Sequence, residues 1–231
     1  MSVLQPASGP RGSGLPPCLV AHRAGNTLAE LRAAERLGIT LVEADVHRYR
    51  GRLEVRHLKT AGPLPILWDR WRLAAPWQRR LRLEELVAAT RAETELVLDL
   101  KGRDDRLPGS VRAVIAPHLP GRRFTICARR WRMLDAFAGL PVRRVYSIGT
   151  ARQLRRLLDR FDGRRLDGVS VHERLLNRAS VGALGAIAET IMTWPVNRPE
   201  RARELLALGV HALITDDSAR IAGLGAAGAA G

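Results

Sequence analysis

Two carboxylates lie two residues apart in an apolar stretch of this chain. Glu43 and Asp45 belong to TLVEADV (residues 40–46), whose β-branched residues predict a strand. Side chains two apart on a strand point to the same side, so both carboxylates would lie together in an apolar frame. Two like charges held in this way are costly unless a cation lies between them.

A third carboxylate, Asp99, comes from the predicted strand ELVLDL (residues 95–100). Three carboxylates with no cysteine nearby suit a hard cation, Mg²⁺ or Ca²⁺, better than zinc. The pattern therefore favours a divalent metal site made of Glu43, Asp45 and Asp99. The alternative that the residues leave open is an ion pair between Glu43 and one of the many arginines.

Two histidines are expected beside these carboxylates. His22 ends the first predicted strand, LVAH (19–22), and His57 ends a small hairpin expected over residues 47–57, around Arg50-Gly51. Histidine changes its charge near neutral pH and can act as an acid or a base. A single histidine is more often structural, but two that flank a pair of carboxylates favour a catalytic role.

Two cations accompany these residues. Arg23 follows His22 directly, and Lys101 lies two residues after Asp99 in a chain whose only other lysine is Lys59. Arginine holds phosphate through its planar fork, and lysine holds it as a point charge. Phosphodiester cleavage requires groups that neutralise the phosphate, activate the attacking oxygen and protonate the leaving oxygen. These tasks match a divalent cation, two histidines, an arginine and a lysine.

The elements that must position these residues alternate between short apolar runs and stretches of helical period. Strands are expected at 19–22, 40–46, 95–100, 124–128, 142–148, 167–171, 190–194 and 212–215. Helices are expected near 28–37, 83–93, 110–117, 130–138, 150–161, 173–186, 199–208 and 217–223, with Thr27 and Asp216 as start signals before the first and the last.

Eight such units predict an α/β fold, a (β/α)₈ TIM barrel in a single domain. An open doubly wound sheet is the alternative, and the absence of GxGxxG after the first strand argues against a dinucleotide fold. A barrel brings the C-terminal ends of its strands to one mouth, where His22, Glu43, Asp99 and their neighbours would meet.

The barrel is expected to span residues 18–223, between flexible tails at 1–17 and 224–231. The hairpin after the second strand leads into an irregular segment, 58–80, with prolines and three tryptophans, Trp68, Trp71 and Trp77. A long loop at this end of a barrel strand is expected to be functional.

Composition narrows the classes of partner. The net charge is +15, but the arginines are scattered along predicted helices with few aromatics between them, so we expect no specific nucleic acid partner. Weak association with an anionic membrane surface remains open, and the oligomeric state is not indicated.

No apolar run reaches the ~18–20 residues of a membrane span. With no apolar signal region and two distant cysteines, Cys18 and Cys127, a cytoplasmic location with reduced thiols is expected.

Four stretches of the chain resemble one known family. VAHRAGNTLAELRAAERLGITLVEADV, LEVRH, LVLDLK and TWPVNRPERARELLALGVHALITDD are similar to the motifs of the glycerophosphodiester phosphodiesterases, over about residues 19–218. The resemblance implies a (β/α)₈ barrel that hydrolyses glycerophosphodiesters to an alcohol and glycerol 3-phosphate with a divalent metal.

The resemblance also implies a role for each matching residue. His22 and His57 would be the acid–base pair, and Trp194 would line the substrate pocket. Phosphate would be bound by Arg23 and Lys101, and the metal by Glu43, Asp45 and Asp99. One histidine would take the proton of the glycerol 2-hydroxyl as it attacks phosphorus, the other would protonate the leaving alcohol, and water would then open a cyclic phosphate.

Three positions depart from the family's pattern. The loop after Arg23 is short, so Ala24-Gly25 runs straight into Asn26-Thr27 and the usual Pro-Glu is missing. Leu58 follows His57 where an aspartate is usual, and Asp99 stands in place of a glutamate. These departures indicate a divergent phosphodiesterase of lipid-derived diesters. They also motivate an alternative, a catalytically degenerate barrel that binds an anionic phosphoester or lipid headgroup.

Overall fold

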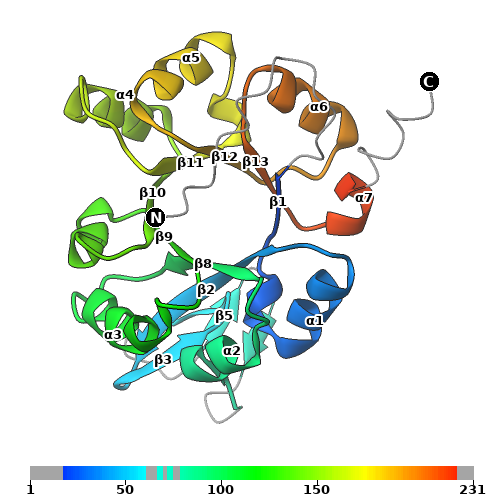
Figure 1. The fold of residues 1–231 in the computed structure, drawn as a ribbon, viewed down its shortest axis with the longest axis vertical. Helices are drawn as coiled ribbons and strands as arrows, with labels where there is room; N and C mark the ends of the chain where they lie inside the picture. Colours follow the sequence, from blue (N-terminus) through cyan, green and yellow to red (C-terminus); the bar gives the residue numbers. More distant parts are fainter. Residues whose placement is uncertain (1–17, 61–66, 70–71, 75–78, 223–231) are drawn as a thin grey trace.

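Eight parallel strands close into a barrel in the computed structural model, which describes residues 18–60, 67–69, 72–74 and 79–222 (Figure 1). The strands are β1 (Cys18–Ala21), β2 (Leu41–Tyr49), β8 (Glu95–Leu100), β9 (Phe124–Ala128), β10 (Arg143–Ile148), β11 (Gly168–His172), β12 (Ile191–Trp194) and β13 (Ala212–Thr215). Closure comes from β1, which pairs with both β13 and β2. The predicted single-domain TIM barrel is confirmed.

Helices surround the barrel (Figure 1). They are α1 (Leu28–Arg36), α2 (Leu83–Ala89), α3 (Leu107–Ile115), α4 (Ala151–Arg160), α5 (Arg178–Ile187), α6 (Pro199–Ala207) and α7 (Ser218–Ala222). The helix expected at 130–138 is instead a 3₁₀ helix, η3 (Trp131–Phe137). None of the helices in the described ranges combines the length and the apolar character that a membrane crossing requires.

The strands are apolar on both faces because they separate two cores. One core packs the outside of the barrel against the helices, and the other fills its interior. The interior side chains come from alternate strand positions: Val20, Leu41, Val97, Cys127, Val145, Met192, Ala212 and Ile214. The barrel is therefore a packed scaffold, and polar side chains can gather only at its ends.

Strand β2 runs past the barrel and turns back as the predicted hairpin with β3 (Arg52–Val55). The turn residues Arg50 and Gly51 both have positive φ, 47° and 81°, which is the type I′ geometry that matches strand twist. Strand β7 (Leu81–Arg82) pairs with β3 as well.

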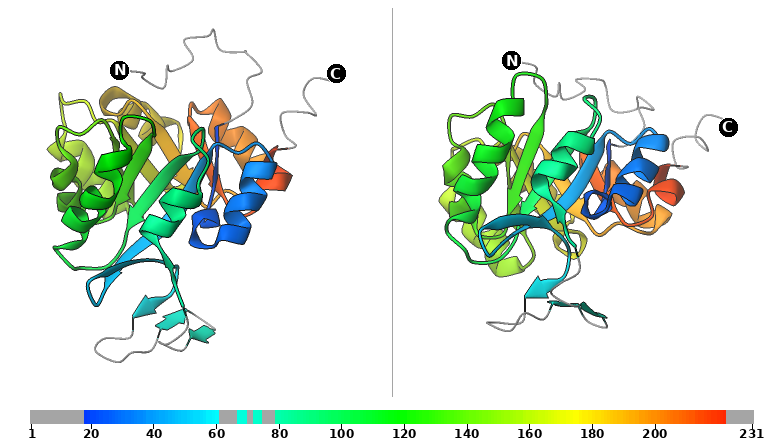
Figure 2. Two further views of the ribbon diagram at one scale, coloured as in Figure 1. Left: turned by 60° about the horizontal axis from the view of Figure 1, so that its bottom comes forward. Right: turned by 90° about the horizontal axis from the view of Figure 1, so that it is seen from below.

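Part of the irregular segment expected at 58–80 forms three short antiparallel strands: β4 (Lys59–Thr60), β5 (Leu67–Asp69) and β6 (Arg72–Ala74). They lie outside the barrel (Figure 2). The predicted tails 1–17 and 224–231, together with Trp71 and Trp77, fall outside the described residues.

A buried ion pair closes the opposite end of the barrel, where the strands begin. The Glu95 side chain is 3% exposed and accepts hydrogen bonds from Thr125 Oγ1 (2.5 Å) and from Arg143 Nη1 (3.0 Å). Burying a carboxylate is costly unless its charge is paired and hydrogen-bonded. Arg143 therefore offsets the cost of placing Glu95 inside the barrel.

Arg143→Met is expected to lower the free energy of unfolding by about 2–4 kcal/mol, because it leaves the Glu95 charge buried with a weaker partner. Urea denaturation measures this change. The matched control is Arg144→Met, whose partner Asp167 is partly exposed, so its loss should be about 0–1 kcal/mol. Equal losses in the two variants would show that the Glu95 pair does not stabilise the fold.

Candidate active site

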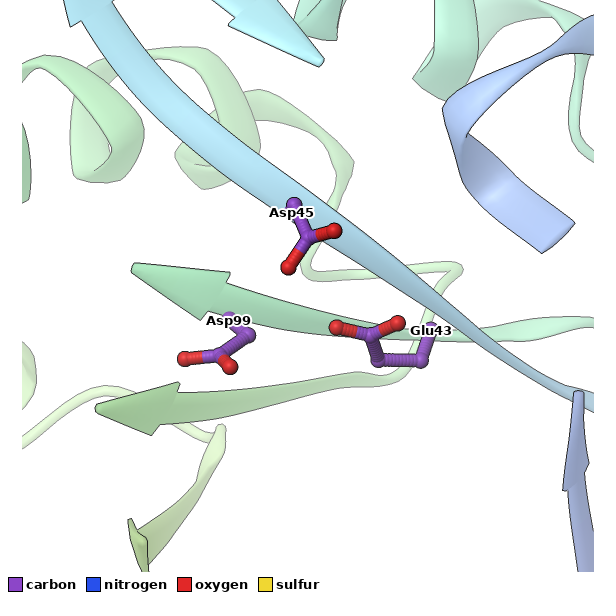
Figure 3. Close-up of side chains that lie close together, drawn as sticks. All are labelled: Glu43, Asp45 and Asp99. Atoms are coloured by element: carbon purple, nitrogen blue, oxygen red, sulfur yellow. The ribbon is translucent and has the colours of Figure 1, made fainter. Parts of the chain in front are cut away.

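Three carboxylates converge at the mouth of the barrel (Figure 3). Glu43 and Asp45 project from β2, and Asp99 projects from β8, where it is paired in register with Asp45. One carboxylate oxygen from each lies within 4.8 Å of the others. Glu43 and Asp45 are 4% and 1% exposed. The grouping expected from the sequence is confirmed, and an ion pair between Glu43 and an arginine is absent from the described residues.

Lys101 is the cation that contacts this cluster. Its ammonium group forms an ion pair with Asp99 and lies 2.8 Å from Asp45 Oδ1. Burial alone would lower the pKa of Lys101, but the carboxylates of Asp99 and Asp45 raise it above its usual range. Lys101 therefore stays charged and neutralises one of the three carboxylates.

The remaining negative charge is poorly compensated. Burial, reinforced by the charge of Asp45, raises the pKa of Glu43 well above its usual range. Burial also raises the pKa of Asp99. For Asp45, burial works in the same direction, but hydrogen bonds from His57 and Lys101 outweigh it and lower the pKa. A further cation beside Glu43 and Asp99 would stabilise the ionised forms of both.

The residues present fit a divalent metal. Asp99 Oδ1 is buried and has no hydrogen-bond partner among the described residues. Three carboxylates and one lysine leave a net charge of two negatives, which one Mg²⁺ or Ca²⁺ ion would balance. All of the donor atoms are hard oxygens. Glu43, Asp45 and Asp99 could therefore hold such an ion.

The shortened loop after Arg23 packs directly on β2. A Cβ at Gly25 would lie 2.7 Å from the Cβ of Ala44, so only glycine allows this approach. The loop brings the Asn26 side chain against Asp45, where Nδ2 donates to Asp45 Oδ2 (2.9 Å) and Oδ1 accepts from the Asp45 backbone N–H (2.8 Å). Sequence reasoning gave Asn26 no role in the site and noted it only as part of the shortened loop after Arg23.

Arg23 lies next to the cluster, and its guanidinium forms no ion pair within the described residues. Its backbone takes the left-handed conformation (φ 58°), and its N–H donates to Glu43 Oε2 at 2.7 Å. Its Nε is buried and lacks a hydrogen-bond partner among the described residues, and no carboxylate there pairs with it. A guanidinium in this state can receive an anion that approaches the carboxylates.

Each of the two histidines is held by a carboxylate. His57 Nδ1 lies 3.1 Å from Asp45 Oδ2, so His57 joins the cluster directly. His22 follows β1 and donates from Nδ1 to Asp216 Oδ1 at 2.6 Å. The Asp216 side chain is oriented in turn by Asn197 Nδ2 at 2.9 Å. A carboxylate on Nδ1 fixes the tautomer and the orientation of the ring.

Sequence reasoning assigned Asp216 to the start of the last helix, and the structure corrects this. Asp217 caps α7, with Oδ1 accepting from the Arg220 N–H at 3.1 Å, and this frees the Asp216 side chain for His22. The signal was available, because Asp216 directly follows β13 and therefore stands at the mouth like the other site residues.

Trp194, at the end of β12, forms part of the mouth together with two residues to which the sequence gave no role in the site. His172 meets its ring edge-on, with centroids 4.9 Å apart, and Arg129 lies over the ring at 5.3 Å. His47 is not in the carboxylate cluster, and burial lowers its pKa to about 3, so it stays neutral.

Comparison with known proteins shows that the fold is shared with enzymes of phosphodiester hydrolysis. A phosphodiesterase from Oleispira antarctica, solved with its product sn-glycerol-3-phosphate, has a TM-score of 0.72 at 20% identity, covering 90% of this chain and 96% of that one. A glycerophosphodiester phosphodiesterase from Parabacteroides distasonis has a TM-score of 0.70 at 18% identity, covering 93% and 100%. The one from Thermotoga maritima has 0.68 at 17% identity, covering 88% and 96%.

Two other comparisons found no relative. No protein-family model matches the chain, and no curated protein matches it. The solved structures described above confirm, at the level of the fold, the resemblance that the sequence motifs indicated.

Asp216→Asn should destabilise the protein in a pH-dependent way. The hydrogen bond from His22 lowers the pKa of Asp216 to about 2, below its value in the unfolded chain. Its ionised form therefore stabilises the fold above about pH 4, and this contribution is lost as the pH falls towards 2. The loss in Asp216→Asn should be on the order of 1 kcal/mol near pH 6, because the side chain is half-exposed, and should shrink below pH 4.

Chemical denaturation between pH 6 and pH 3 measures this difference. Asp217→Asn is the matched control, because asparagine caps a helix as well as aspartate does and position 217 does not contact His22. A penalty for Asp216→Asn that is constant across this range would contradict the assignment of the charge to the His22 pair.

Proposed function

We propose that this protein is a metal-dependent phosphodiesterase that hydrolyses glycerophosphodiesters or related lipid-derived diesters. The observation that carries the proposal is the buried cluster of Glu43, Asp45 and Asp99 at the mouth of a barrel, with His57 bonded to the cluster and His22 directly after the adjacent strand β1. The fold likeness to phosphodiesterases, one of them bound to sn-glycerol-3-phosphate, supports a small-molecule diester as substrate.

Each part of the site has a distinct task. A divalent ion held by Glu43, Asp45 and Asp99 would supply positive charge to the phosphate oxygens. Arg23, whose guanidinium has no ion pair in the part of the chain that the structure describes, binds the phosphate from the β1 side, and Lys101 adds a second fixed positive charge beside the cluster. Trp194 provides an apolar wall for the substrate.

The histidines move the protons. One takes the proton from the glycerol 2-hydroxyl while that oxygen attacks phosphorus, and the other gives a proton to the leaving alcohol oxygen. Water then opens the cyclic phosphate to give glycerol 3-phosphate, with the two histidines in reversed roles. In His22, Nδ1 is bonded to Asp216, so Nε2 is the atom that faces the substrate. Asp216 and Asp45 hold the rings of His22 and His57 in place through Nδ1.

His22→Ala and His57→Ala are each expected to lower kcat on glycerophosphocholine by about 10²–10⁴, because each removes a proton-transfer group. Release of sn-glycerol 3-phosphate measures turnover, and circular dichroism verifies that the fold is kept. His118→Ala is the matched control, since His118 is exposed and follows α3 away from the mouth.

Full activity in both histidine variants would refute the mechanism. Saturable binding of diesters with no turnover by the unaltered chain would identify the site as a binding module instead.

Mg²⁺ or Ca²⁺ at about 100 times its Kd is expected to stabilise the protein by about 2.7 kcal/mol, or about 5–10 °C in Tm for a chain of this size. Thermal denaturation with and without each ion measures the shift, and EDTA should reverse it. Asp99→Asn should abolish the shift, whereas Asp105→Asn, an exposed aspartate paired with Arg132, should keep it.

A Tm that neither ion changes, or diesterase activity that persists in excess EDTA, would remove the metal from the proposal.

A further inference from the structure

Arg129 reaches across the barrel mouth from a strand next to the carboxylate cluster. It directly follows β9, the neighbour of the strand that carries Asp99, and its guanidinium lies 5.3 Å from the ring centre of Trp194 on β12. Gly149, after β10, lies beneath this path, and a Cβ there would overlap the guanidinium. The absence of a side chain at 149 therefore allows Arg129 to lie over Trp194.

A groove continues outward from Arg129 along the first turns of α4. It has a volume of about 570 Å³ and is lined by Arg129, Arg152 and Arg156, with Thr150 and Gln153 between them. Within the described residues no carboxylate lies at ion-pair distance from any of the three arginines. The groove therefore collects three positive charges that form no ion pair within the described residues, beside the mouth.

This arrangement differs from an ordinary solvated arginine face. Such a face lies on the same helix, where Arg155, Asp159 and Arg160 adjoin Arg152 and Arg156, so Arg129 is the residue that distinguishes the groove. Arg129 follows β9, lies over the ring of Trp194 and passes over Gly149. Its own position and these two residues together place its charge. Stacking on an aromatic face leaves the N–H edge of a guanidinium available for an anion.

We propose that Arg129, Arg152 and Arg156 form a second anion subsite that selects diesters whose alcohol moiety carries a further phosphate or carboxylate. The inference rests on the proposed function. Arg23, beside Glu43 at the cluster, is placed for the reacting phosphate. The glycerol arm of the substrate is uncharged and would gain no ion pair from three arginines. The groove is therefore assigned to the other substituent of the diester.

The test compares glycerophosphoglycerol with 1,3-bis(glycerophospho)glycerol, which carries one more glycerophosphate unit and therefore one more negative charge, with kcat/KM expressed per scissile diester. The unaltered chain is expected to prefer the second in kcat/KM. Arg129→Gln should lower kcat/KM about tenfold for the bis-phosphorylated substrate, as expected for a lost charge-assisted hydrogen bond, and less than threefold for the other. Gly149→Ala keeps the charge but displaces it, and should reproduce the selective loss.

Arg203→Gln is the matched control, since it removes an exposed arginine from α6 and should leave both values unchanged. Equal losses on both substrates in Arg129→Gln would overturn the proposal, because Arg129 would then contact the phosphate that both share. An unaltered preference in Arg129→Gln and Gly149→Ala would overturn it as well.

A binding measurement separates this inference from the proposed function. In His22→Ala, titration calorimetry with 1,3-bis(glycerophospho)glycerol should give a Kd about tenfold lower than with glycerophosphoglycerol, and Arg129→Gln in that background should remove the difference. This preference without turnover in the unaltered chain would support the subsite while refuting the diesterase. Turnover without any preference would refute the subsite alone.

Discussion

Mutual repulsion among Glu43, Asp45 and Asp99 is the constraint on which the arrangement of the barrel mouth depends. Their oxygens lie within 4.8 Å of one another in a largely buried position, where like charges are expensive. The surrounding groups act as compensation, because Lys101, His57 and the Asn26 side chain all contact Asp45. The chain's own groups neutralise the cluster only partly, and this deficit is what a divalent ion would remove.

Closure of the barrel makes that concentration of charge feasible. The interior is packed with apolar side chains from every second strand position, so polar groups are confined to the two ends. The end where the strands begin carries the compensated pair of Glu95 and Arg143, and the other end carries the uncompensated cluster. One end therefore stabilises the fold, and the other holds unsatisfied charge that a ligand can use.

The departures from the family's pattern alter the surroundings of this cluster more than the cluster itself. The short loop after Arg23 packs through Gly25 on β2 and delivers Asn26 to Asp45, so the missing glutamate does not leave that carboxylate without a neighbour. Asp99 reaches the other two carboxylates although it is shorter than glutamate. At the rim, Arg129 and the arginines of α4 surround a groove next to Trp194.

The sequence by itself determined the eight strands, the closed fold and the carboxylate cluster, because strand periodicity is local and a barrel brings every strand end to one mouth. Helix type after β9 was predicted less well, since packing rather than period set the 3₁₀ turns of η3. Only the tertiary structure decided that Asp216 orients His22, that Asn26 holds Asp45 and that Arg129 crosses to Trp194. These contacts join residues far apart in the chain through side-chain directions, which no local pattern encodes.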